Sequence, residues 1–206
     1  MKKHITKKSI AIISLALLIL ITVGTTLALV FTNTKPVENT FKPSKVSCAV
    51  VETLVNGDNS TTTETSAGTV SNFTSKSNVQ IKNTGDTDAF IRVAVVVNWM
   101  SADGTKVWAQ KPAINTDYSI AFKQDDWVQG ADGYWYCKKA VASGSLTDTL
   151  ITSAQQKKAA PEGYYLSIEI VASAIQSSPD DVVGKQWSND HTTVTGSNGT
   201  LTITNK

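Results

Sequence analysis

The feature that most constrains the fold of this chain is a recurring two-residue alternation of apolar and polar side chains. One such segment is Tyr164–Gln176 (YYLSIEIVASAIQ). It places Leu166, Ile168 and Ile170 on one side and polar residues between them. Successive side chains of a β-strand point to opposite faces, so this pattern predicts strands with one buried face. Past residue 40, no stretch keeps the 3.6-residue helical period for more than about three turns.

Continuous apolar runs and turn dipeptides complete the predicted strands. The segment Ala89–Met100 (AFIRVAVVVNWM) is apolar at nearly every position, which predicts a central strand covered on both faces. About eight or more short strands predict an all-β fold, a jelly-roll-like sandwich of two sheets. Hairpins between strands can be closed by dipeptides that accept positive φ, namely Asn56-Gly57, Asp103-Gly104, Asp132-Gly133 and Asn198-Gly199.

Two segments depart from the strand pattern. The Thr- and Ser-rich stretch Asn56–Lys76 predicts a long loop or a mobile insertion. The run Ser178-Pro179-Asp180-Asp181 offers a capping residue, a proline and acids for a first helical turn. We therefore expect a short helix that ends by Trp187, and one or two short helices in all.

The amino-terminal segment predicts export. Four lysines precede an uncharged run, Ile10–Phe31, that is long enough to span a bilayer. Small residues lead up to Ala28, so residues 1–28 are expected to be a signal peptide cleaved before Leu29. The length of the run also permits an uncleaved membrane anchor that reaches residue 31. Both interpretations place residues 32–206 outside the membrane, with membrane contact only through this segment if it is retained.

The charge of the remaining chain is close to zero. The sequence holds 19 basic and 17 acidic residues, and four of the lysines lie in the amino-terminal segment. A nearly neutral body has no general electrostatic attraction to nucleic acid or to anionic lipid. We expect no nucleic-acid partner.

Sequence motifs of catalysis are missing. Zinc hydrolases commonly present an HExxH pair, which does not occur, and the body has a single histidine, His191. A serine hydrolase would need that same histidine, and no GxSxG motif is present. We interpret His191 as an exposed turn residue rather than as a metal ligand beside Cys48 or Cys137. The chain is expected to be no enzyme and to need neither a metal nor a cofactor.

Cysteine and tryptophan provide the candidate site residues of the body. Cys48 and Cys137 lie in predicted strands, where a disulfide would stabilise the fold by about 4 kcal/mol. Two free thiols or an intersubunit bond are the alternatives. Trp108, Trp127 and Trp135 lie beside predicted turns, where aromatic rings can bind sugars or a partner protein. Cross-strand pairing inside the fold is the alternative role for these rings.

Several short motifs occur in a coherent order along the chain. They are Gly24-Thr25-Thr26-Leu27-Ala28, Asn39-Thr40-Phe41, IKNTGD at 81–86 before the apolar strand Phe90–Trp99, and LSIEI at 166–170 running into ASAIQ at 172–176. With these motifs the chain resembles the TasA/camelysin (CalY) family of Gram-positive bacteria. It is most similar to the clostridial BsaA-like members, which are exported through the signal peptidase SipW.

The resemblance implies a secreted structural protein, a jelly-roll subunit of biofilm matrix fibres in the extracellular matrix or on the cell surface. Its partners would be further copies of itself, after processing by signal peptidase. In such fibres the freed amino-terminal segment adds as a strand to the next subunit, which here would be residues 29–39 ahead of a domain at 40–206. Leu29, Phe31 and Val37 could fill a groove at an open sheet edge. Pro36 has no backbone N–H, so it must lie where the strand need not donate a hydrogen bond.

A second function remains open beside the fibre subunit. An uncleaved leader would leave a membrane-anchored cell-surface module that binds glycan or host protein through the three tryptophans. The state of the natural amino terminus separates the two, because an intact Met1 excludes a freed donor strand.

Overall fold

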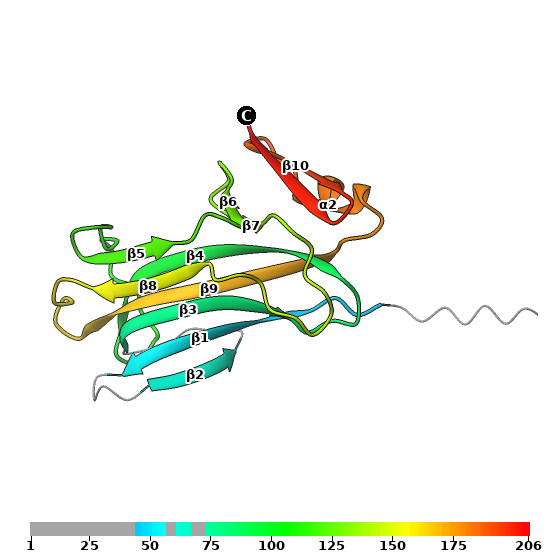
Figure 1. Cartoon of the computed structure of the whole chain (residues 1–206). Helices are drawn as coiled ribbons and strands as arrows, with labels where there is room; N and C mark the ends of the chain where they lie inside the picture. The colour runs from blue at the N-terminus through cyan, green and yellow to red at the C-terminus, as the bar shows by residue number, and fades with distance from the viewer. Residues whose placement is uncertain (1–43, 57–60, 67–72) are drawn as a thin grey trace, which may run out of the picture. The chain divides into compact units, whose positions relative to one another are not determined.

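The computed structural model in Figure 1 describes residues 44–56, 61–66 and 73–206. The chain divides into two compact units, Met1–Lys42 and Pro43–Lys206, and the described residues all belong to the second. The export segment and residues 29–39 lie outside the described residues. The predictions made for them therefore stay predictions.

The second unit is a sandwich of antiparallel strands with one short helix, α2 (Asp181–Trp187), among its described residues. Its strands are β1 (Cys48–Asn56), β2 (Thr61–Ser66), β3 (Phe73–Asn83), β4 (Ala89–Ser101), β5 (Tyr118–Phe122), β6 (Trp127–Gln129), β7 (Trp135–Cys137), β8 (Ile151–Gln156), β9 (Tyr164–Gln176), β10 (Thr192–Ser197) and β11 (Thr200–Asn205). One sheet has the order β2-β1-β3-β8-β5, the other β6-β7-β4-β9, and β10 pairs with β11 (Figure 1). The predicted all-β, two-sheet sandwich is confirmed.

The expected loop at Asn56–Lys76 is wrong for most of its described residues. Here β2 occupies Thr61–Ser66 and β3 begins at Phe73, and both strands pair with β1. Threonine is β-branched and favours extended backbone. The composition that indicates a polar loop therefore also suits β2, which is the last strand of its sheet.

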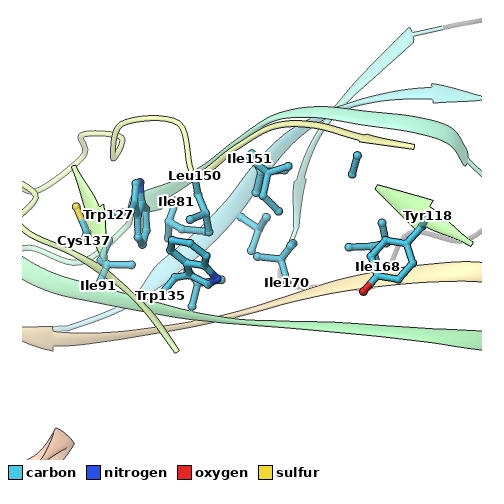
Figure 2. Packing of buried hydrophobic residues seen from close by; sticks show 14 of the residues in the cluster. Ile81, Ile91, Tyr118, Trp127, Trp135, Cys137, Leu150, Ile151, Ile168 and Ile170 are labelled. Atoms are coloured by element: carbon cyan, nitrogen blue, oxygen red, sulfur yellow. The ribbon is translucent and has the colours of Figure 1, made fainter. Parts of the chain in front are cut away.

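The main hydrophobic core lies between the two sheets. Figure 2 shows Ile81 of β3, Ile91 of β4 and Ile151 of β8 packed together, and each of the three is fully buried. Trp127 and Trp135 join the same cluster from β6 and β7. Side chains of at least five strands thus hold the sandwich together, because burial of apolar surface is the dominant stabilising term.

A second, smaller core lies on the outer face of the four-stranded sheet. It contains Phe90, Tyr136, Val183, Trp187, Val194 and Leu201 from β4, β7, α2, β10 and β11. The helix and the β10–β11 hairpin therefore cover one end of β4. Farther along the same face Val96 is 39% exposed, so the expectation that β4 is covered on both faces holds only near Phe90.

Polar and aromatic contacts fasten this smaller core to the sheet. The Arg92 guanidinium lies 4.2 Å from the Tyr134 ring centre and 4.8 Å from that of Trp187. The Tyr136 hydroxyl donates a hydrogen bond to Asp132 at 2.6 Å. The cation–π contact of Arg92 with Trp187 thus links β4 to α2, whereas the charge-assisted bond of Tyr136 stays within the β6–β7 segment.

Candidate functional site

The outer edge of β9 is capped by a buried lysine. Nζ of Lys76, on β3, donates to the Ile168 carbonyl of β9 at 2.9 Å. The same ammonium lies 2.7 Å from Oε2 of Glu52, and both side chains are fully buried or nearly so. A charge directed at a strand edge discourages pairing with another chain. The edge of β9 is therefore protected at its centre.

The opposite side of β4 is paired only toward the ends of the strand. Toward its start, Val93 pairs with Trp135 of β7. Toward its end, the Trp99 carbonyl accepts the N–H of Trp108 at 2.9 Å. Between these two points lie the five residues Ala94–Asn98, which have no strand partner on this side within the described part of the chain.

The backbone groups of this stretch point outward from the sheet. Ala89 exchanges two hydrogen bonds with Val141, at 3.0 and 2.8 Å, on the side of β4 away from β9. Alternate residues of a strand direct their N–H and C=O groups to the same side. The backbone groups of Ala89 and Trp99 both form hydrogen bonds on the side away from β9. The N–H and C=O groups of Val95 and Val97 must therefore point to that side too. Among the described residues, the N–H and C=O groups of Val95 and Val97 have no backbone partner on this side of β4.

An uncharged cleft of about 340 Å³ opens beside this stretch, between β4 and β5, and Gln124 and Gln129 line it together with apolar residues. No charged side chain lines it among the residues that the structure describes. Burying an unpaired charge is costly, so such a cleft favours an uncharged occupant. Its apolar lining consists chiefly of Val95 and Val97 of β4, Ile120 and Phe122 of β5, Trp135 of β7 and Ile114 of the preceding loop.

The wall formed by β5 is bonded to the preceding loop at its first residue, Tyr118. The Asn115 N–H donates to the Tyr118 carbonyl at 2.6 Å. Phe122 stacks on Trp135 with ring centres 4.3 Å apart, and Ile114 is 52% exposed. The cleft thus combines apolar walls, an aromatic pair and the open backbone edge of β4.

The surface-binding prediction is wrong for two of the three tryptophans. Trp127 and Trp135 are only 1% and 5% exposed and belong to the core. A place beside a turn does not reveal which face of the sheet a side chain occupies. Trp108 is 42% exposed, packs edge-on against Tyr164 at 4.9 Å, and borders a hollow of about 250 Å³. Only Trp108 therefore stays a surface candidate.

The two cysteines are free thiols, and the suggested disulfide between them is not formed. Cys48 lies on β1 of the five-stranded sheet, whereas Cys137 lies on β7 of the four-stranded sheet. Burial raises the pKa of the Cys48 thiol, and burial raises the pKa of Cys137 to about 11. Both thiols are therefore protonated and weakly nucleophilic at neutral pH.

The structure adds little support for a functional role of the remaining predicted residues. His191 is exposed before β10, and its backbone N–H donates to the Asn189 side chain. In the described ranges, no three His, Cys, Asp or Glu side chains form a group suited to a metal ion. No helix there is long and apolar enough to cross a membrane. Four predicted residues, Ala28, Leu29, Phe31 and Val37, lie outside the described residues.

Sequence reasoning missed the cleft. The alternation in YSIAF at 118–122 could have indicated Ile120 and Phe122 as inward-facing strand residues. The unpaired stretch Ala94–Asn98 has no local signal, because it depends on how short β7 is and on where the loop around Trp108 returns to β4. No protein-family model, curated protein or solved structure matches this chain.

Proposed function

We propose that this chain is an exported structural protein, a subunit of extracellular biofilm matrix fibres that assembles by lending residues 29–39 to a neighbouring copy. The observation that carries the proposal is the stretch Ala94–Asn98 of β4, whose outward backbone groups lie beside an uncharged cleft with largely aliphatic and aromatic walls. An extended segment can complete such an edge, because backbone hydrogen bonds supply affinity and alternate side chains supply register. The motifs shared with the TasA/camelysin family point to the same function.

The test compares two chains by electron microscopy, one that begins at Leu29 and one that begins at Thr40. We expect fibres from the longer chain and monomers from the shorter one, because only the longer chain carries the donor segment. If both stay monomeric at high concentration, strand donation is wrong.

Processing by signal peptidase is the matching proposal for the natural protein. Cleavage after Ala28 would free Leu29 as the first residue of the donor segment. The mass of the natural protein decides this, since an intact Met1 leaves no free strand to donate.

A second candidate function is a membrane-anchored module that binds glycan or host protein through Trp108. It is favoured by the exposure of that ring and by the adjacent hollow, which Gln110, Lys111 and Asp117 also line. Aromatic faces beside hydrogen-bonding groups suit sugar rings. An intact Met1, together with saccharide binding that Trp108→Ala abolishes, would favour this function over the fibre subunit.

A further inference from the structure

We infer that a pocket between the carboxyl-terminal end of β9 and α2, here called the α2 pocket, binds a small carboxylate with an apolar body through Arg92. The pocket has a volume of about 510 Å³. None of its lining residues belongs to the open stretch Ala94–Asn98 or to the cleft beside that stretch. The inference therefore goes beyond the proposed strand donation and does not depend on it.

The guanidinium of Arg92 has no counter-ion at contact distance in the described part of the chain. It belongs to none of the ion pairs there. The Asp132 carboxylate is linked to it through the Tyr136 hydroxyl, which donates to Asp132 and is hydrogen-bonded to Arg92. A partly buried charge is costly unless an opposite charge accompanies it. The α2 pocket therefore favours a ligand that brings a negative charge to Arg92.

One hydrogen-bond donor of Arg92 is also unused. Its Nε is buried and has no hydrogen-bond partner. The rings of Tyr134 and Trp187, 4.2 and 4.8 Å from the guanidinium, hold the group by cation–π contacts but supply no acceptor. A guanidinium presents its N–H groups as a planar fork that matches the two oxygens of a carboxylate. A carboxylate that meets this fork from the pocket would supply both the acceptor and the charge.

The rest of the lining indicates the body of the ligand. Among the described residues, Arg92 is the one charged side chain that lines the pocket, so the local charge attracts anions. Ile175, Val182 and Trp187 provide apolar walls, and Gln186 provides an amide that can donate or accept a hydrogen bond. An apolar body would bury surface against these walls. An inorganic phosphate or sulfate has no such surface and suits the pocket less well.

The test measures binding of three small probes to the chain that begins at Leu29. N-acetyl-leucine carries a carboxylate and an apolar body, N-acetyl-leucinamide has the same body without the charge, and acetate has the charge without the body. Dissociation constants come from ligand-detected saturation-transfer NMR, which reads binding to monomers and to assembled chains alike.

We expect the parent chain to bind N-acetyl-leucine at least tenfold more tightly than either of the other probes. Arg92→Met should remove the preference for the acid over the amide and leave the affinity for the amide nearly unchanged. A merely structural role of Arg92 would not produce that selective loss. Arg92→Lys should keep a weaker preference, because an ammonium retains the charge but not the planar fork.

A second variant leaves Arg92 in place. Gln186 is exposed on α2 and lines the pocket, so Gln186→Glu adds a carboxylate that repels the ligand and competes for Arg92. It should weaken binding of N-acetyl-leucine by roughly tenfold or more. Gln155→Glu is the matched control, because Gln155 is exposed on β8 and does not line the pocket. This control should bind the acid like the parent chain.

Three results would overturn the inference. One is equal affinity of the parent for N-acetyl-leucine and its amide, and another is a Gln186→Glu chain that binds the acid as tightly as Gln155→Glu does. The third is acetate binding as tightly as N-acetyl-leucine, which would show that the apolar walls take no part. Circular dichroism checks each fold, and if Arg92→Met unfolds, Gln186→Glu decides the outcome. Strand donation is judged separately by electron microscopy, so its failure would leave these affinities unchanged.

Discussion

The buried ion pair between Lys76 and Glu52 permits a quantitative prediction. The Lys76 ammonium lies 2.7 Å from the Glu52 carboxylate and 2.9 Å from the Ile168 carbonyl, with no solvent exposure. Lys76→Met keeps most of the unbranched stem and removes the ammonium from the buried pair. Breaking one partner of a buried pair costs about 3–5 kcal/mol. For a unit of this size that loss lowers the melting temperature by roughly 6–20 °C.

The assay is urea unfolding followed by tryptophan fluorescence, with the free energy of unfolding extrapolated to water. Lys158→Met is the matched control. Its side chain is 70% exposed and lies 3.9 Å from Asp117, so little measurable change is expected. The double variant Glu52→Leu with Lys76→Met should regain most of the loss, because apolar replacements of a buried pair are often neutral or stabilising.

Two outcomes would refute this reasoning about the buried pair. One is a Lys76→Met variant that loses less than about 1 kcal/mol, the size of an exposed pair. The other is a double variant as unstable as the single one, which would show that the carboxylate left behind is not the source of the cost.

Further predictions concern titration and reactivity. Burial and the hydrogen bond to Asp132 raise the pKa of Tyr136 to about 12 from an ordinary 10.0. Its contribution to stability is complete below about pH 10 and falls as the pH rises toward 12, so urea unfolding of Tyr136→Phe should depend less on pH in that range. Burial raises the pKa of Asp132, but hydrogen bonds from Tyr136 and Asn189 lower it more, so the net shift is downward. The stability that Asp132 contributes is present above its ordinary pKa of 3.8 and is lost as the pH falls through the lower pKa of the folded state. In Asp132→Asn, the free energy of unfolding should therefore fall less steeply as the pH is lowered through this range. Mass spectrometry after iodoacetamide treatment of the folded protein should show the half-buried Cys48 alkylated before Cys137, and equal rates would contradict the burial difference.

Strands and helices with long or regular local sequence signals could be predicted from the sequence. Tyr164–Gln176 alternates clearly at Leu166–Ile170 and forms β9 with the predicted bounds. The helix that the run at 178–181 indicates is present as α2 and ends at Trp187, but it begins only at Asp181, and its N-cap is Asp180, which makes no side-chain capping hydrogen bond, instead of the expected Ser178. In both cases the signal is local, because side-chain alternation and capping depend on neighbouring residues alone.

Features that depend on distant segments could not be predicted. Trp127 and Trp135 flank a turn, but which face of the sheet they occupy is decided by packing against the other sheet. The cysteines lie on strands of different sheets, and sequence gives no distance between them. The open stretch Ala94–Asn98 arises because β7 has only three residues and pairs with β4 at just two, Arg92 and Val93.

The long ladder between β4 and β9 would have a mechanical consequence in the fibre that we propose. All thirteen residues of β4 pair with β9, from Ala89 opposite Gln176 to Ser101 opposite Tyr164. A neighbour attached along β4 would pull parallel to that strand. The tension would then act in shear on all the hydrogen bonds between β4 and β9 together, instead of breaking them one after another. The strand that receives the next subunit would thus also be the one best anchored against being drawn out.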